Sequence, residues 1–430
     1  MSVKTPWAIL FCRFQDATRT HLPIKAFHDL FTISGRGRQN IVDYFHDNSH
    51  GHLDLDNNTL FGWIDLPMRS VDYTGSGANF QGRVDFVSRV RQAARAAGVP
   101  LQDYYNVYIS TDPAVDTYGL TTGVVMTLRG SDTSPTIIAH EMGHGFGLAH
   151  SRAEGVAGDY ADQHDIMSAW SGPLGPVHTF RHPSIQPAGP GQSVAGPALS
   201  AANMLAKGWF DLPRLLEIED CGFRDRIVLR PHLRTDLPGW LAVRIARRYI
   251  IEFRVDEGWD AGIPQACVRV LTIEGGASRV ASPAPGSYTL LAGAAFAPDR
   301  TSTYPHLIRV AVASIDAAAR EARIDVSLDC VDPPRPDLPP LPFPTPVLPH
   351  DVPLRWPRVE PSWPTPYPWE LANLQAGCDE VIAAADTADD VVRRARERMA
   401  WQRVRDAADA ALAKLDASCT PPEPRKREQE

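Results

Sequence analysis

The sequence predicts an α/β domain built on a twisted sheet and one long helix, followed by an all-β sandwich domain and a short helical C-terminal tail. Three observations predict this order. Strand and helix signals alternate from residue 1 to about 175, and short strands separated by turns replace them from Arg226 to Leu328. Residues Glu370 to Ser418 are rich in Ala and Arg and show helical periodicity. A chain of 430 residues is long enough for two or three domains.

These changes of pattern divide the chain into five segments. We expect an α/β domain at 1–212, which also carries the histidine run analysed below, a β-sandwich domain at 213–330, a proline-rich linker at 331–369, a helical hairpin at 370–420 and a disordered tail at 421–430. The linker should adopt an extended polyproline II conformation. Its interleaved tryptophans leave two roles open, a spacer or a docking strip for an aromatic-lined protein partner.

The first segment carries a regular series of elements. We expect an N-terminal strand within residues 1–14, a helix from Arg38 to Asp47, strands at His52–Leu55 and Phe61–Leu66, a helix from Arg83 that stops at Gly98, a strand at Tyr104–Ser110 and an edge strand at Thr121–Leu128. A further helix begins after Ser134, a plausible N-cap, with Pro135 at the first helical position.

This last helix carries the most informative run of the chain, His140-Glu141-Met142-Gly143-His144-Gly145-Phe146-Gly147-Leu148-Ala149-His150. Residues i and i+4 share one face of a helix, so His140 and His144 can aim at one point, with Glu141 on the same turn. Gly147 allows a sharp turn that ends the helix, because glycine adopts positive φ. The chain then delivers His150 as a third nitrogen ligand.

Three neutral imidazoles and one water molecule make an open tetrahedral zinc site, the arrangement that catalysis requires. We therefore expect one catalytic Zn²⁺ bound by His140, His144 and His150, with Glu141 as the catalytic residue beside its water. The competing interpretation is that these are ordinary helix histidines without a metal.

A methionine in a polar turn, Met167, follows the histidine run. The zinc run followed by such a methionine resembles the signature of the metzincin metallopeptidases. That resemblance implies that Met167 forms an apolar floor beneath the metal. Some metzincins carry a tyrosine ligand two residues after this methionine. This chain has Ala169 there, so no fifth protein ligand is expected.

Residues Asp43–Leu55, together with Phe61-Gly62-Trp63, are similar to the corresponding region of gametolysin-like and immune-inhibitor-A-like peptidases. The resemblance implies a zinc metalloendopeptidase that acts on a protein or peptide substrate, held in extended form against the strand near Gly123–Thr127. Two alternatives stay open. The chain could be a catalytically silent zinc protein that serves as a binding module, or a zinc hydrolase of non-peptide substrates.

Composition limits the other function classes. A formal net charge of −8 and the absence of a strongly basic run argue against nucleic-acid binding, and no run of 18 apolar residues predicts a membrane span. The N-terminus does not look like a signal peptide, although the resemblance implies secretion. The compartment is therefore left open between a secreted and a leaderless or cytoplasmic protein.

Several polar residues admit both a structural and a functional interpretation. The six widely spaced cysteines exclude a cysteine-based zinc module. Cys12 is expected in a buried strand, and a disulfide between Cys378 and Cys419 could join the two ends of the helical tail. The local group His46, His50 and His52 is expected to be polar loop and strand residues rather than a second metal site. Tyr160 and His164 are expected in a solvated loop, with substrate contact as the alternative.

Overall fold

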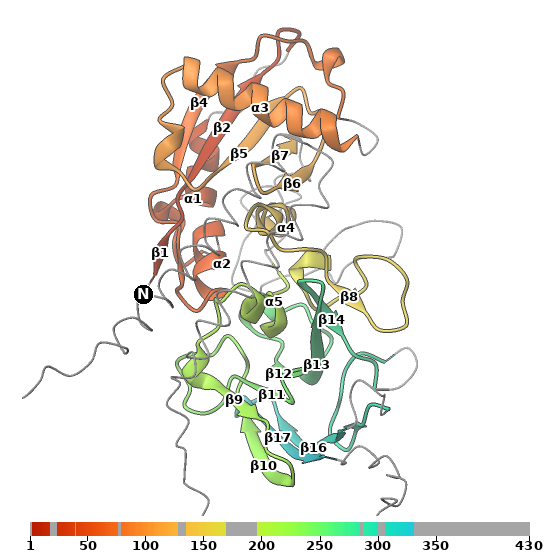
Figure 1. Cartoon of the computed structure of the whole chain (residues 1–430). Helices are drawn as coiled ribbons and strands as arrows, with labels where there is room; N and C mark the ends of the chain where they lie inside the picture. The colour runs from red at the N-terminus through yellow and green to blue at the C-terminus, as the bar shows by residue number, and fades with distance from the viewer. Residues whose placement is uncertain are drawn as a thin grey trace, which may run out of the picture. The chain divides into compact units, whose positions relative to one another are not determined.

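The computed structural model describes residues 2–17, 24–38, 40–75, 79–127, 135–168, 196–283, 287–299 and 306–330 (Figure 1). All of them belong to one compact mixed α/β unit, Met1–Asp337. The expected linker, hairpin and tail lie outside the described residues, as do Ser134 and Ala169. Among the described helices, none has the length and apolar character needed to span a bilayer.

The described helices are α1 (His28–Phe31), α2 (Ile41–Asp47), α3 (Phe80–Ala96), α4 (Pro135–Gly145) and α5 (Ala201–Ala206). The strands up to residue 168 are β1 (Val3–Lys4), β2 (Trp7–Arg13), β3 (Leu53–Asp54), β4 (Thr59–Asp65), β5 (Asn106–Asp112), β6 (Tyr118–Leu120), β7 (Gly123–Thr127) and β8 (Arg152–Ala153). The later strands are β9 (Leu215–Ile218), β10 (Phe223–Leu229), β11 (Ala242–Ile245), β12 (Tyr249–Arg254), β13 (Cys267–Glu274), β14 (Ala277–Val280), β15 (Ala295–Phe296), β16 (Leu307–Asp316) and β17 (Glu321–Asp329).

The N-terminal lobe, residues 2–168, is organised by a five-stranded sheet with the order β4-β2-β5-β7-β6. Its first four strands run parallel, and β6 pairs antiparallel with β7. Strand β2 is apolar on both sides, as expected for a parallel strand covered on both faces. Trp7, Ile9 and Phe11 belong to one core, and the alternate residues Ala8, Leu10 and Cys12 belong to another.

Helices cover both faces of this sheet (Figure 1). Helix α3 packs one face through Phe86, Val87 and Val90, in the core that contains Cys12. Helices α1, α2 and α4 pack the other face. The predicted helix at 83–97 is thus α3, which begins earlier because Asn79 caps its N-terminus by accepting a hydrogen bond from the Gly82 backbone.

The expectation that Thr121–Leu128 forms the edge of the sheet is wrong. Its described part forms β7 (Gly123–Thr127), which lies between β5 and β6, and among the described strands β6 is the outermost on this side. The short β6 could not be predicted, because its sequence contains no apolar run. It turns back through Thr121 and Thr122 to pair with β7, and it lies against α4.

The C-terminal lobe, residues 215–330, consists of two sheets with a shared core. The larger has the order β8-β14-β13-β12-β11-β9, and the smaller has the order β10-β17-β16-β15. Val243, Ile251 and Phe253 of the larger sheet join Ile324 and Val326 of the smaller one in this core. The pattern of short strands also predicts one at Tyr288–Leu291, but this segment forms only an isolated bridge through Leu290. The sequence pattern missed β9, β14 and β15.

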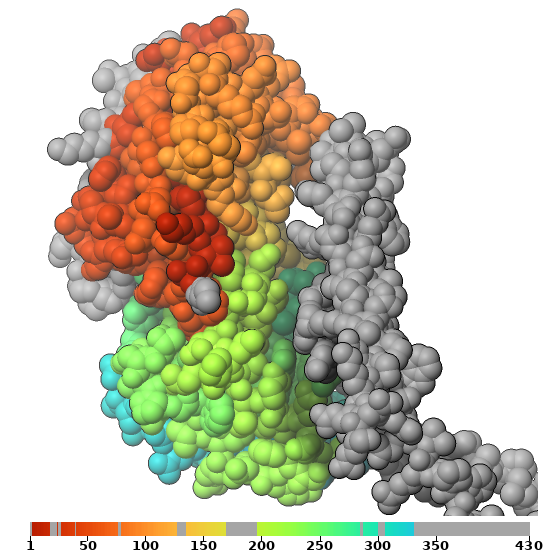
Figure 2. Space-filling model, turned by 60° about the vertical axis from the view of Figure 1, so that its left-hand side comes forward, coloured from red at the N-terminus to blue at the C-terminus, as the bar shows by residue number. Residues whose placement is uncertain are grey.

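The opposite face of the larger sheet packs against the N-terminal lobe. Ala242, Ile250 and Leu271 belong to the same core as α2 and α4. Strand β8 follows the histidine run by two residues, yet it pairs with β14 of the C-terminal lobe. The two lobes, red to orange and green to cyan in Figure 2, therefore share both a core and a sheet.

A disulfide joins Cys221 to Cys330, a pair separated by 109 residues, and so links the start of the C-terminal lobe to its last described residue. Cys12 is a buried free thiol in β2, as expected, and Cys267 is a second one. Cys378 and Cys419 lie outside the described residues.

We expect the double substitution Cys221→Ser, Cys330→Ser to lower the free energy of unfolding by about 2–5 kcal/mol, because the cross-link restricts the unfolded chain. Urea denaturation followed by circular dichroism measures the change. Wild-type protein unfolded in the presence of a reductant is the matched control and should reproduce the variant. Equal stability with and without the cross-link would contradict the expectation.

Candidate metal centre

Helix α4 places the first two histidines, and a tight turn places the third. The helix ends at Gly145, and Gly147 has φ of +82°, a left-handed conformation that favours glycine. The Leu148 backbone N–H donates to the Gly143 carbonyl and closes the turn. The chain therefore reverses direction immediately after the helix and brings His150 back beside it.

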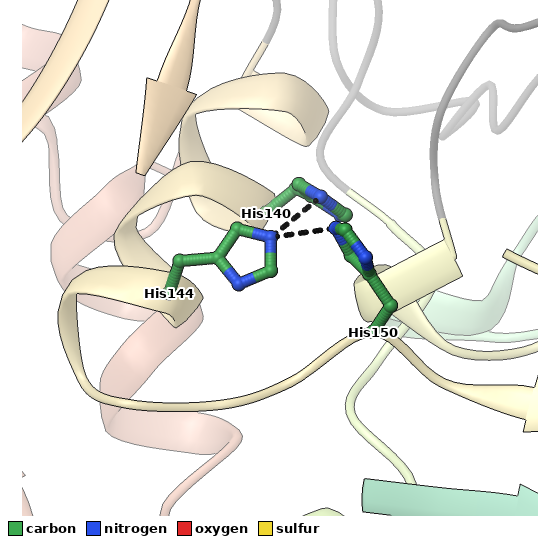
Figure 3. Close-up of side chains that lie close together, drawn as sticks. All are labelled: His140, His144 and His150. Carbon is green, nitrogen blue, oxygen red and sulfur yellow. Dashed lines mark hydrogen bonds between the residues drawn. The ribbon is translucent and has the colours of Figure 1, made fainter. Parts of the chain in front are cut away.

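The three imidazoles converge through their Nε2 atoms (Figure 3). His144 Nε2 lies 3.2 Å from His140 Nε2 and 2.9 Å from His150 Nε2. Within the described part of the chain, these three residues form the one group of His, Cys, Asp or Glu side chains close enough to hold a metal ion. They could hold such an ion at the point where the rings meet.

Each ring is oriented by an acceptor for its other nitrogen. His140 Nδ1 donates to the Ile166 carbonyl at 2.7 Å, and His144 Nδ1 donates to the Leu148 carbonyl at 2.8 Å. His150 Nδ1 lies 3.1 Å from Asp159 Oδ2. A carbonyl can only accept, so the proton sits on Nδ1 in the first two rings and the Nε2 lone pair faces the centre. This arrangement is typical of histidine ligands to metals.

The environment keeps the rings neutral, as metal ligation requires. Burial lowers the pKa of His140 to about 3 and that of His144 to about 4. Burial also lowers the pKa of His150, which is more exposed. Burial alone would raise the pKa of Asp159, but hydrogen bonds from His150 and Arg152 lower it, so this carboxylate is ionised opposite the His150 ring.

Glu141 lies on the same turn as His140, and 3% of it is exposed. Burial raises the pKa of its carboxyl group to about 8, although a hydrogen bond from the Gly119 backbone favours the ionised form. Gly119 belongs to β6, so the outermost strand of the sheet touches the carboxyl group directly. A carboxyl group with a pKa near neutrality is suited to accepting and returning a proton.

Met167 is fully buried in the short 3-10 turn Ile166–Ser168, against the middle of α4. A Cβ atom at Gly143 would lie 2.5 Å from Met167 Sδ, so the sulfur packs directly on the helix backbone between the first two histidines. Asp165 holds the turn by accepting hydrogen bonds from the backbone of Met167 and from Ser200 and Asn203.

Tyr160 lies at the site, although the sequence interpretation favoured a solvated loop position for it over substrate contact. Its ring centroid lies 3.9 Å from that of His150 and 5.9 Å from that of His140, so it does not belong to a solvated loop away from the site. Burial raises the pKa of its phenol to about 12, and the nearby Glu141 carboxylate adds to the shift. The sequence offered no periodicity here from which this position could be deduced. His164 makes structural backbone contacts instead, with Asp162 and Arg254.

A buried set of charges anchors the loop between His150 and Met167 to the C-terminal lobe. Arg269 pairs with Asp162 of the loop and with Glu252 of the neighbouring strand. Arg254 pairs with Glu252 and Asp260, and it also donates to the His164 carbonyl at 2.9 Å. We call these five residues, Asp162, Glu252, Arg254, Asp260 and Arg269, the lobe ion cluster.

The rings of His46, His50 and His52 do not converge on one point. His46 pairs with Asp47, His50 bonds the His232 carbonyl and accepts from the Asp211 backbone, and His52 bonds the Ser49 carbonyl. Each ring is thus satisfied by its own neighbours, as structural loop and strand residues would be.

No protein-family model, curated protein or solved structure matched this chain in the comparisons that were made. The resemblance to the metzincins therefore rests on sequence alone: the histidine run, Met167, and the segments Asp43–Leu55 and Phe61–Trp63.

We expect the metal-free protein to take up one divalent ion per chain, and His144→Ala to weaken its affinity on the order of 100-fold or more, because one of three ligands is lost. Competition with a chromophoric chelator measures the affinity. His46→Ala removes an exposed histidine outside the group and is the matched control, which should bind as the wild type does. An unchanged affinity in His144→Ala would show that the ion binds elsewhere.

The lobe ion cluster predicts acid sensitivity. Burial alone would raise the pKa of Glu252, but Arg254 and its neighbours lower it to about 2, below the ordinary value of 4.5. Its contribution to stability is therefore present above pH 4.5 and lost as the pH falls towards 2. We expect the difference in unfolding free energy between wild type and Glu252→Gln to shrink on the order of 3 kcal/mol over that interval.

Urea denaturation at a series of pH values measures this difference. Glu219→Gln changes an exposed glutamate paired with Arg247 and serves as the control, for which the difference from wild type should be small throughout. A difference between wild type and Glu252→Gln that stays constant from pH 7 to pH 2 would contradict the assignment.

Proposed function

We propose that this chain is a zinc-dependent endopeptidase of the metzincin type, similar to the gametolysin-like and immune-inhibitor-A-like peptidases. One observation carries the proposal: three oriented Nε2 atoms converge beside a buried glutamate on the same helix. The fold agrees with it in general form, since a mixed sheet backed by the histidine helix precedes a lobe of two β-sheets. We propose that these lobes are a metzincin-like catalytic domain and a β-sandwich domain.

The ligand chemistry fits zinc. Three neutral nitrogen donors with hydrogen-bonded Nδ1 atoms, and no fourth His, Cys, Asp or Glu ligand among the described residues, correspond to an open catalytic zinc site. Zinc bound there supplies a Lewis acid that acidifies a water molecule and polarises a carbonyl group. Met167 supports the floor of the site by packing on α4 at Gly143.

Glu141 moves the proton. Its carboxylate accepts the proton of the attacking water and later returns it to the departing amine, so the same group acts first as a base and then as an acid. The charge of a cation held by the neighbouring imidazoles favours the ionised carboxylate, which opposes the effect of burial. The Gly119 hydrogen bond fixes the carboxyl group in place while the proton moves.

The substrate would lie along β6 rather than along β7, the strand named from the sequence. Strand β6 is outermost in its sheet as described, and its Gly119 backbone contacts Glu141. An extended peptide can add to such a strand through main-chain hydrogen bonds. This places a scissile carbonyl beside Glu141 and the three imidazoles.

We expect Glu141→Ala to reduce hydrolysis of casein by a factor of 100 or more, roughly the contribution of a general base, while zinc stays bound. Digestion is followed by gel electrophoresis with and without a zinc chelator, and bound zinc by atomic absorption. Glu219→Ala, at an exposed ion pair in the C-terminal lobe, is the control and should digest normally. Loss of zinc from Glu141→Ala would mean that the glutamate is structural. A zinc-loaded wild type that cleaves neither casein nor a peptide library would exclude the peptidase.

A further inference from the structure

Tyr160 lies at the metal centre, although the loop that carries it has no part in the histidine run. Its ring stacks within 5.9 Å of the His140 ring, at an interplanar angle of 26°, and lies still closer to His150. The residue is half-buried.

The backbone at Tyr160 is held in an unfavourable conformation. Its φ is +65°, in the left-handed region, where a non-glycine residue pays roughly 1–2 kcal/mol. Strain of this kind persists only where the surroundings impose it, and it gathers at functional sites. Both flanks are fixed here, since Asp159 pairs with His150 and Arg152, and Asp162 pairs with Arg269. The loop is therefore built to hold the tyrosine where it is.

None of the three histidines has a free N–H group that could donate a hydrogen bond to a substrate. The Nδ1–H groups of His140 and His144 are used on backbone carbonyls, and that of His150 faces the Asp159 carboxylate. Their Nε2 atoms present lone pairs, and an ionised Glu141 is an acceptor. Attack on a carbonyl group places negative charge on its oxygen, and a hydrogen-bond donor aimed at that oxygen stabilises the transition state. A phenol beside the rings provides such a donor.

We propose that the Tyr160 hydroxyl donates a hydrogen bond to the substrate oxygen that becomes negatively charged, which makes Tyr160 a catalytic residue. The phenol keeps its proton throughout, and no covalent bond to it is formed or broken. This inference rests on the proposed function and extends it by one residue, supplied by the loop between His150 and Met167.

The substitution Tyr160→Phe tests the proposal, because it keeps the ring on His150 and removes only the hydroxyl. We expect kcat for peptide hydrolysis to fall about 100-fold with KM nearly unchanged, the effect of losing one donor to a developing oxyanion. Metal affinity, measured by chelator competition, should stay at the wild-type value. Tyr104→Phe, where the ring packs on Phe61 of β4, is the matched control and should leave all values unchanged.

A second measurement does not depend on peptidase activity. Inorganic phosphate is a tetrahedral anion, and its binding to the cobalt(II)-loaded protein can be followed by visible absorption. We expect Tyr160→Phe to weaken phosphate binding about 10-fold or more, since a hydrogen bond to a charged group is worth roughly 1.5–3 kcal/mol.

The outcomes separate the two proposals. A wild type that cleaves no peptide, together with weaker phosphate binding by Tyr160→Phe, would reject the peptidase but support the donor. If the wild type is active and Tyr160→Phe has the same kcat and the same phosphate affinity, the role of Tyr160 is overturned and the peptidase proposal stands. A large loss of metal affinity in Tyr160→Phe would also overturn it, because the hydroxyl would then be a ligand.

Discussion

The two lobes are joined by charges that are buried at their junction. Arg254, Arg269 and Glu252 project from the face of the larger sheet that also carries Ile250 and Leu271, and all three are fully buried. Buried ions are tolerated only when their partners are in place, because removal of one leaves an uncompensated charge in a medium that solvates it poorly. One of those partners, Asp162, belongs to the loop that follows the histidines. The position of this loop is therefore fixed by electrostatic pairing across the lobes.

This pairing makes the metal centre a product of both lobes. The third histidine is followed at once by β8, which hydrogen-bonds to β14 of the C-terminal lobe. Asp165 secures the methionine turn to Ser200 and Asn203, and Ser200 in turn contacts Ser278 of β14. The contacts that shape the candidate site cross the domain boundary that the sequence predicts at residue 212. A lobe that looks like an accessory domain in the sequence thus anchors the segment between His150 and Met167.

The parts of this molecule governed by local rules were predictable. Helical spacing brings His140 and His144 together, and the positive φ of Gly147 returns His150 to them. The lobe ion cluster was not predictable, because Glu252 and Arg254 lie in a strand where alternating charged residues normally face solvent. Six cysteines allow many pairings, so the Cys221–Cys330 bond could not be deduced from spacing. The sequence left the position of Tyr160 open between a solvated loop and substrate contact, because that position depends in part on the distant pairing of Asp162 with Arg269.

The close packing of Gly143 on the sulfur of Met167 has a consequence for natural variation of this fold. Even a methyl group at position 143 would occupy the space of the thioether, so a larger residue there requires a smaller or displaced one at 167. The two positions should then change together among related chains. A chain in which both have changed would have a reshaped base beneath its imidazoles, a mark by which an altered site could be recognised from its sequence.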